Sequence, residues 1–161
     1  MTVQAFPVAA LLLGRDADAS HSAALAAMAR MAADLGAAPV VVAIPPGIEL
    51  PSGPRIVRTR PQGSAIAAIR LGMAQLANSM ARSALLWPHD GAQPSLVALL
   101  ALLDEAKRSS DAIVAFAAAP LDRSPIFVPR DAWLELVTLG EEGLEAVAGR
   151  RRVARVVADA G

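Results

Sequence analysis

The sequence predicts a three-layer α/β fold, in which helices cover both faces of a mostly parallel sheet. Short apolar runs rich in Leu, Val and Ile alternate with segments in which apolar residues recur at helical spacing. That alternation is typical of parallel strands joined by crossover helices. With 161 residues and 55% hydrophobic content, the chain is large enough for a sizeable core, and we expect residues 1–161 to form a single domain.

Gly, Pro and hydroxyl residues mark where the expected elements begin and end. We expect Ser20 or Ser22 to cap the first helix, because a hydroxyl oxygen accepts a hydrogen bond from a free amide in the first turn. The elements of the first half are a strand at Pro7–Leu13, a helix that ends at Gly36, strands at Val40–Ile44 and Ile56–Thr59, and a helix that opens at Gln62–Ser64. Those of the second half are a strand at Ala84–Trp87, a helix capped by Ser95, strands at Asp111–Ala118 and Pro125–Val128, short helices at Asp131–Val137 and Glu141–Ala148, and a strand at Val153–Val157.

The composition argues against several classes of function. A formal net charge of zero is not expected of a general nucleic-acid or membrane-surface protein. Without cysteines the chain has no disulfide framework and no thiolate metal site or nucleophile. No apolar run reaches the length of a membrane span, and no basic flank precedes the first apolar run as in a signal peptide. We therefore expect a cytoplasmic protein that binds neither nucleic acid nor membrane.

The stretch from Ser83 to Asp90 (Ser-Ala-Leu-Leu-Trp-Pro-His-Asp) carries the clearest functional signal. Its apolar run stops at His89 and Asp90 and is followed by a Gly/Pro turn. Ligands of open α/β sheets bind beyond the carboxyl ends of such strands, so both side chains are expected at a site. The alternative is that His89 and Asp90 only cap the next helix.

Several short motifs follow one another in a recognisable order. They are the strand that ends in Asp90, the helix start Gly63-Ser64 with Gly72 further on, Ser124-Pro-Ile-Phe-Val-Pro129, and Glu141-Glu-Gly143 ahead of a Val-rich strand. Their order resembles that of the MobA-like nucleotidyltransferases, the molybdenum-cofactor cytidylyl- and guanylyltransferases and their relatives. The segment His89-Asp-Gly-Ala-Gln-Pro94 is similar to the His-Asp-Ala-Ala-Arg-Pro stretch of the methylerythritol-phosphate cytidylyltransferases. Both groups share one Rossmann-like nucleotidyltransferase fold, which the resemblance implies here.

The resemblance also implies a ligand site. Asp90 would hold the Mg²⁺ that bridges the phosphates of CTP or GTP, consistent with the preference of Mg²⁺ for one or two carboxylates plus phosphate oxygens. Gly63 and Ser64 would lie beside the base or ribose, because glycine permits close approach and the amides of a helix start meet acceptors. Taken without the family, Gly63-Ser64 is an ordinary helix N-cap.

The first loop departs from the family pattern. Relatives have Gly-Gly-x-Ser-x-Arg-Met-Gly followed by Lys, and their loop surrounds the triphosphate with amides and cations. Here the strand is followed by a shorter segment from Gly14 to Ser20, in which only Gly14 and Arg15 match and two acids would repel a triphosphate. The only lysine is the distant Lys107. Relatives also continue after the last strand into Asp-x-Asp-Thr-Pro, so we expect a second metal carboxylate to be missing.

Three interpretations of function remain open. The chain is an enzyme that transfers a nucleotidyl group from CTP or GTP to a phosphorylated small molecule, or an inactive nucleotidyltransferase-like binding or assembly protein, or an α/β protein whose motif matches are chance. The degenerate phosphate-binding loop predicts weak or lost activity. Abundant Ala and Leu predict apolar surface that supports a homo-oligomer.

A few charged residues are secondary candidates. Arg58 and Arg60 point to one face of a strand, either to bind an anion or as part of a solvated edge. Asp122 and Arg123 would line the substrate side by analogy with the family. The basic run Arg150–Arg152 is interpreted as a solvated turn, since it lacks the interleaved aromatics of a nucleic-acid groove.

Overall fold

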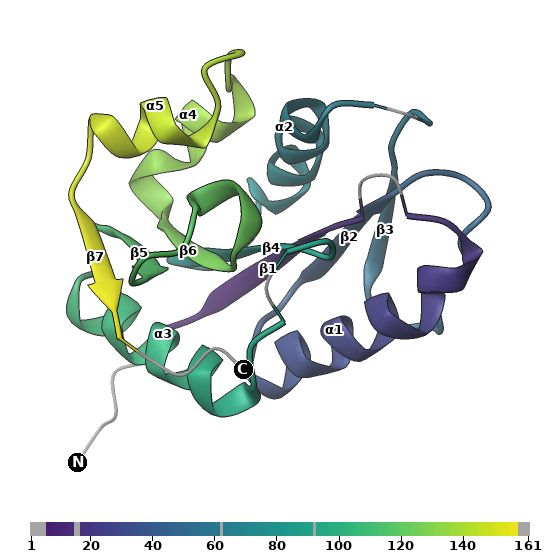
Figure 1. Ribbon diagram of the computed structural model, residues 1–161, viewed down its shortest axis with the longest axis horizontal. Coiled ribbons are helices and arrows are strands. Elements are labelled where there is room, and N and C mark those ends of the chain that lie inside the picture. Colours follow the sequence, from purple (N-terminus) through teal and green to yellow (C-terminus); the bar gives the residue numbers. More distant parts are fainter. Residues whose placement is uncertain (1–5, 15–16, 62, 92, 158–161) are drawn as a thin grey trace.

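A computed structural model describes residues 6–14, 17–61, 63–91 and 93–157. Its seven strands form one sheet in the order β3-β2-β1-β4-β6-β5-β7 (Figure 1). All strands run parallel except β6, which is antiparallel to both β4 and β5. The predicted mostly parallel α/β fold is confirmed. The strands are β1 (Val8–Leu13), β2 (Val40–Ile44), β3 (Arg55–Arg58), β4 (Ser83–Pro88), β5 (Ile113–Phe116), β6 (Ile126–Pro129) and β7 (Val153–Val156).

Helices cover both faces of this sheet. In Figure 1, α2, α4 and α5 lie on one side and α1 and α3 on the other. The α-helices are α1 (Ser22–Asp34), α2 (Ala65–Leu76), α3 (Leu96–Arg108), α4 (Trp133–Val137) and α5 (Leu144–Gly149), and the 3₁₀ helices are η1 (Ala19–His21), η2 (Leu121–Arg123) and η3 (Arg130–Ala132). Among the described residues, no helix is long and apolar enough to span a bilayer.

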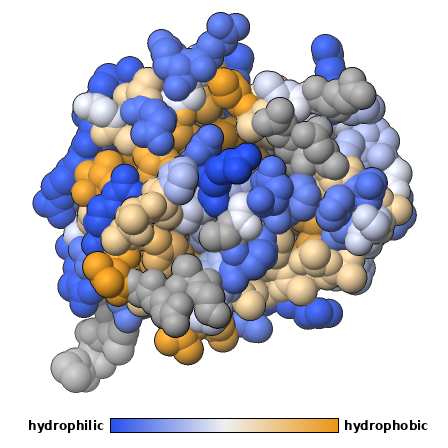
Figure 2. All heavy atoms as spheres, viewed as in Figure 1, coloured by the Kyte–Doolittle hydropathy of each residue, from blue (hydrophilic) through white to orange (hydrophobic). Residues whose placement is uncertain are grey.

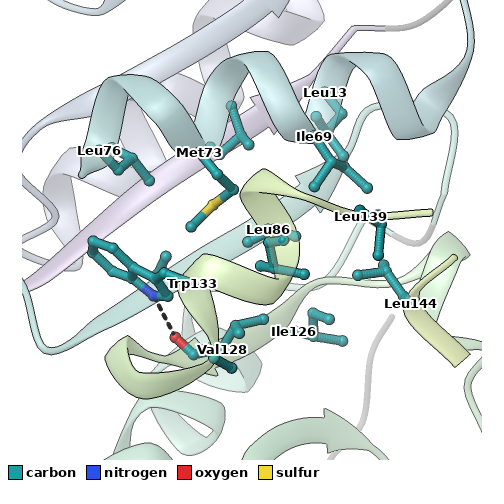
Figure 3. Packing of buried hydrophobic residues seen from close by; sticks show 14 of the residues in the cluster. Leu13, Ile69, Met73, Leu76, Leu86, Ile126, Val128, Trp133, Leu139 and Leu144 are labelled. Atoms are coloured by element: carbon teal, nitrogen blue, oxygen red, sulfur yellow. Dashed lines mark hydrogen bonds between the residues drawn. The ribbon is translucent and has the colours of Figure 1, made fainter. Parts of the chain in front are cut away.

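The alternation of side chains along β1 divides the core into two halves. Leu11 and Leu13 pack with α2, α4 and α5, whereas Val8 and Leu12 pack with α1 and α3. Every residue of β1 is buried, as expected of a strand covered on both faces. Figure 3 shows the first half, in which Ile69 and the other apolar side chains of α2 face those of β4, β6 and α4.

Both tryptophans belong to the core. Trp87 on β4 is 1% exposed and Trp133 on α4 is 4% exposed. The indole Nε1 of Trp133 donates a hydrogen bond of 3.1 Å to the carbonyl oxygen of Val128 (Figure 3). Because a buried indole N–H needs an acceptor, this bond fixes the orientation of the ring and joins α4 to β6.

Helix α2 lies so close to β1 that Gly72 is required at their contact. A Cβ added at Gly72 would lie 2.3 Å from Cδ1 and 2.6 Å from Cδ2 of Leu11, whose side chain is fully buried. We therefore expect Gly72→Val to lower the free energy of unfolding by about 1–3 kcal/mol, the usual cost of overpacking. Urea denaturation of Gly72→Val measures this loss.

Gly149→Val is the matched control for the overpacking at Gly72. Gly149 ends α5 and has nothing within 4 Å of an added Cβ, so its substitution should change stability by no more than roughly 0.5 kcal/mol. Equal losses in the two variants would contradict close packing between α2 and β1.

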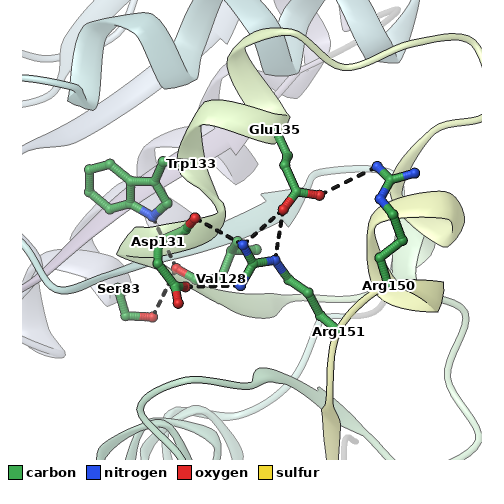
Figure 4. A network of polar contacts seen from close by, with 7 residues as sticks. All are labelled: Ser83, Val128, Asp131, Trp133, Glu135, Arg150 and Arg151. Carbon is green, nitrogen blue, oxygen red and sulfur yellow. Dashed lines mark hydrogen bonds and ion pairs between the residues drawn. The ribbon is translucent and has the colours of Figure 1, made fainter.

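The predicted solvated turn at Arg150–Arg152 is wrong for Arg151, whose side chain is only 19% exposed. Its Nε and Nη2 lie 2.9 and 2.8 Å from one carboxylate oxygen of Glu135, and its Nη1 lies 3.1 Å from Asp131 Oδ1 (Figure 4). Arg150 also donates to Glu135, at 3.4 Å. These bonds join the segment between α5 and β7 to α4, so the basic run has a structural role.

The same contacts predict how stability depends on pH. Hydrogen bonding from Arg151 is the main reason that the pKa of Glu135 lies below its ordinary value of 4.5 in the folded protein. A lowered carboxyl pKa contributes stability above the unfolded value, and that contribution disappears as pH falls through the folded value. We expect Arg151→Met to cost about 1–2 kcal/mol at pH 7.

The measurement is urea denaturation of wild type and Arg151→Met from pH 7 down to pH 3. The difference in unfolding free energy should shrink as the pH drops below 4.5. Arg152→Met is the control, because Arg152 only approaches Asp111 at 4.0 Å and both side chains are largely exposed. A difference that stays constant with pH would contradict the assigned role of Glu135.

Candidate functional site

Strands β1 and β4 end side by side at one edge of the sheet. Leu13 pairs with Pro88 at their last position, and the backbone N–H of His89 donates to the carbonyl oxygen of Leu13 at 2.9 Å. Because β4 is the middle strand of the sheet, Asp90 lies beyond the carboxyl end of a central strand, as predicted. The capping alternative is wrong, since Ser95 caps α3 by accepting from the N–H of Ala98 at 3.2 Å.

A pocket of about 140 Å³ opens at this edge. The charged residues around it are Asp90 after β4 and Asp122 and Arg123 in η2, all with exposed side chains. Within the described part of the chain, these three side chains form no ion pair or hydrogen bond, so they are available to a ligand. The rest of the lining is formed by Leu13, Ala65, Ile69, Leu86, Pro88, Leu121 and Leu144.

Gly91 allows the segment that carries Asp90 to pack closely against η2, which carries Asp122 and Arg123. A Cβ added at Gly91 would lie 2.2 Å from the carbonyl oxygen of Arg123, so the backbone after β4 packs directly on η2. Any larger residue at this position would clash with the backbone of Arg123, so one of the two segments would have to move. The sequence analysis did not single out Gly91, although a glycine directly after a strand-end acid is a signal of close backbone approach.

The segment before α2 has the geometry of a helix start. Ser64 Oγ accepts from the N–H of Ala67 at 3.0 Å, and the N–H of Gly63 donates to the carbonyl oxygen of Arg60 at 3.0 Å. Of the residues Gly63 to Ala65, Ala65 lines the pocket. The N-cap role of Ser64 is therefore confirmed, while binding of a base or ribose by Gly63 and Ser64 stays a prediction.

Arg58 supports a loop and does not face the pocket. Its Nη1 donates to the carbonyl oxygens of Pro45 and Ile48 at 3.1 and 2.8 Å. Strand β3, on which it lies, is at the edge of the sheet, as one of the two interpretations expected.

Backbone hydrogen bonds fix Gly14 and Ala17 next to the end of β1. The N–H of Gly14 donates to the carbonyl oxygen of Ala43 at 2.8 Å. The N–H of Ala17 donates to the carbonyl oxygen of Gly14 at 3.0 Å. A Cβ at Gly14 would lie 2.4 Å from Cγ2 of Ile44, which explains the glycine by packing. Arg15, the predicted phosphate ligand, lies outside the described residues.

Asp18 caps the helical segment that follows, so the predicted caps Ser20 and Ser22 are wrong. Asp18 Oδ1 accepts from the N–H of Ser20 at 2.9 Å, and the N–H of Asp18 donates to Nδ1 of His21 at 3.0 Å. The N–H of His21 donates to the carbonyl oxygen of Asp18 at 2.9 Å. A carboxylate accepts more strongly than a hydroxyl, which explains why Asp18 takes this place.

This cap uses the donors that an anion would need. The amides of Ala17, Asp18, Ser20 and His21 all have acceptors within the loop. Hydrogen bonds from the Ser20 hydroxyl and backbone lower the pKa of the Asp18 carboxyl from its ordinary 3.8, so it is negatively charged at neutral pH. The start of the first helix, where a phosphate would be expected, thus holds a carboxylate of the chain itself.

The two histidines of the chain meet at this edge. The rings of His21 and His89 lie edge to face with centroids 5.0 Å apart, and His89 Nδ1 lies 3.3 Å from the carbonyl oxygen of Leu13. This contact joins the cap before α1 to the loop that carries Asp90. The contact was not predicted from the sequence, because His21 and His89 are far apart along the chain.

The described residues contain no group of three or more His, Cys, Asp or Glu side chains that could hold a metal ion. Asp90 and Asp122 are the two carboxylates at the pocket. That set fits an ion whose remaining ligands are water and phosphate oxygens, as Mg²⁺ prefers. Hydrophilic residues also gather near the centre of the face drawn in Figure 2.

Sequence comparisons identify no family for the chain. No protein-family model and no curated protein matches it. Structural comparison is informative, since many solved structures share the fold.

The fold is that of nucleotidyltransferases. The chain is similar to Rv0371c from Mycobacterium tuberculosis, at 16% identity and a TM-score of 0.73 over 98% of this chain and 90% of that one. A complex of Rv0371c with manganese gives 17% identity and a TM-score of 0.70 over 95% and 89%. The 2-C-methyl-D-erythritol 4-phosphate cytidylyltransferase from Thermus thermophilus gives 20% identity and a TM-score of 0.59 over 96% and 90%.

Proposed function

We propose that the chain is a nucleotidyltransferase-like domain that binds a nucleotide at the carboxyl edge of its sheet and has weak or lost transfer activity. The ligand is CTP or GTP with Mg²⁺, and the MobA-like relation implied by the sequence motifs is part of this proposal. An active form would transfer the nucleotidyl group to a phosphorylated small molecule. The similarity of the fold to that of a cytidylyltransferase supports this class of ligand.

Asp90 is the proposed metal ligand. It lies beyond the central strand β4 with an exposed carboxylate that has no partner among the described residues, and Asp122 lies at the same pocket. The manganese complex of a structural neighbour supports a divalent ion in this fold. A bound ion would hold the nucleotide phosphates near the pocket while neutralising their charge.

The observation that carries the loss of activity is the Asp18 cap. Phosphoryl and nucleotidyl transfer depend on amides and cations that stabilise charge around the triphosphate. In this chain the amides of Ala17, Asp18, Ser20 and His21 are already bonded, and the Asp18 carboxylate adds a like charge. Loss of a single donor of this kind costs about two to three orders of magnitude in rate.

The alternative is an inactive nucleotidyltransferase-like protein that serves in assembly. Four large apolar side chains support it, because Met80, Val97, Leu134 and Val157 are between 75% and 92% exposed. Self-association through such residues remains a proposal.

Binding is tested by thermal shift with CTP, GTP and ATP, each with Mg²⁺. A nucleotide at ten times its Kd should stabilise the fold by about 1.4 kcal/mol and raise Tm by roughly 3–6 °C. Asp90→Ala should abolish the shift, whereas Asp104→Ala, which removes an exposed acid on α3, should retain it. No shift with any nucleotide would contradict the proposed ligand.

Activity is tested by pyrophosphate release with CTP or GTP, Mg²⁺ and a panel of phosphorylated acceptors. We expect turnover far below the roughly one per second of ordinary enzymes. Turnover near that rate that disappears in Asp90→Ala would contradict the loss of activity.

The effect of the cap is tested by Asp18→Ala. Removal of the carboxylate frees the Ser20 amide and takes away a negative charge, so CTP–Mg²⁺ should bind roughly two- to fivefold more tightly. Isothermal titration calorimetry measures the change. Asp34→Ala is the charge-matched control at the far end of α1, and an equal gain there would mean that only net charge matters.

A further inference from the structure

An unexplained feature of the structure is a cavity of about 420 Å³ at the opposite edge of the sheet. It lies between α1 and the residues that precede β3, next to the amino end of β2. Its position separates it from the pocket at Asp90, because β2 and β4 are parallel strands in the same sheet and the two openings lie at opposite strand ends.

The side chains that line the cavity from α1 are mostly small and apolar. Ala26, Ala29 and Ala33 follow one another at helical spacing along α1, and Pro39 and Val40 continue the wall. Alanine leaves a hollow that a larger side chain would fill, and the surface over α1 in Figure 2 is mostly pale orange, the shade of weakly hydrophobic residues. The volume lies within the roughly 300–1,000 Å³ of small-molecule sites.

The opposite wall runs from Leu50 to Pro54, and the loop that leads into it is held in place. Ser22 Oγ donates to the carbonyl oxygen of Glu49 at 2.8 Å, and Arg58 Nη1 donates to that of Ile48 at 2.8 Å. The Ile48 side chain is 1% exposed. The cavity is therefore formed without a ligand, which lowers the entropic cost of binding.

Arg30 is the one charged residue of the lining. Its side chain is exposed and forms no ion pair or hydrogen bond within the described part of the chain, not even with Asp34 one turn further along α1. A free guanidinium beside an apolar cavity can pair with an anion through two parallel N–H donors, a geometry that matches a carboxylate.

We propose that this cavity binds a small amphipathic carboxylate. The apolar body of the ligand lies against the alanine, proline and valine side chains, and its carboxylate pairs with Arg30 at the rim. One guanidinium balances one negative charge, which favours a monocarboxylate over a doubly charged phosphate monoester. The site is separate from the proposed nucleotide site and does not depend on it.

The test compares sodium octanoate with 1-octanol, which has the same chain and no charge. Titrations are followed by ¹H–¹⁵N NMR of the full chain, and octanoate should shift the amides of α1 and those of Leu50, Ser52 and Gly53. We expect octanoate to bind about tenfold more tightly than octanol, as befits a charge-assisted pair. In Arg30→Gln this preference should disappear while octanol binding is unchanged.

Two further variants control the test. Ala33→Trp fills the cavity from an exposed position of α1 and should abolish binding of both ligands, while an unchanged melting temperature shows that the fold is intact. Arg60→Gln removes an exposed arginine that does not line the cavity and should leave octanoate binding as in wild type.

Several results would overturn the proposal. Equal affinities for octanoate and octanol would do so, as would an unchanged octanoate affinity in Arg30→Gln. Amide shifts centred on the loop of Asp90, or no binding at millimolar octanoate, would also contradict it. Light scattering that shows self-association of the wild type, lost in Ala33→Trp, would identify a second copy of the chain as the occupant and would equally overturn it.

Discussion

The pairing of β1 with β4 is the constraint on which the rest of the structure depends. Both strands are buried on both faces, and their register brings Leu13 opposite Pro88. Parallel strands must end at the same edge of a sheet, so the turn at Gly14 and the loop of Asp90 become neighbours regardless of their separation in sequence. The hydrogen bond from His89 to Leu13 and the contact between His21 and His89 follow from that pairing.

The two sides of this edge have different consequences for function. On the β4 side, Gly91 packs on η2, and Asp90 and Asp122 line one pocket without an ion pair or hydrogen bond to any described residue. Two such carboxylates are a suitable arrangement for a hydrated divalent ion. On the β1 side, acceptors on Gly14, Asp18 and His21 satisfy the amides of Ala17, Asp18, Ser20 and His21. In the proposed function, metal binding and triphosphate binding are therefore separable, because the carboxylates at the pocket serve the first while the Asp18 carboxylate competes with the second.

Local patterns in the sequence predicted much of the fold. The apolar runs placed the strands, and the hydroxyls of Ser64 and Ser95 marked the starts of α2 and α3. The position of Asp90 at the carboxyl edge followed from the strand pattern. The antiparallel direction of β6 did not, because it is set by pairing with β4 and β5 from distant parts of the chain.

The misses share a cause, since each depends on contacts that spacing does not reveal. Arg151 is mostly buried because Asp131 and Glu135 lie across from it, although its neighbours in sequence suggested a solvated turn. The helix expected from Glu141 begins at Leu144, after Gly143 with a φ of 75°. Asp18 displaced the expected serine caps because its carboxylate bonds Ser20 while its amide bonds His21.

We propose that the amides of Ser20 and His21 are held by Asp18 and take no part in nucleotide binding. A ¹H–¹⁵N NMR titration of the wild-type chain with CTP and Mg²⁺ tests it most directly. The account predicts shifts for the amides of Ala65, Asp90 and Gly91, with those of Ser20 and His21 unchanged. Shifts of Ser20 and His21 as large as that of Asp90 would show that the triphosphate displaces the cap, and would contradict the account.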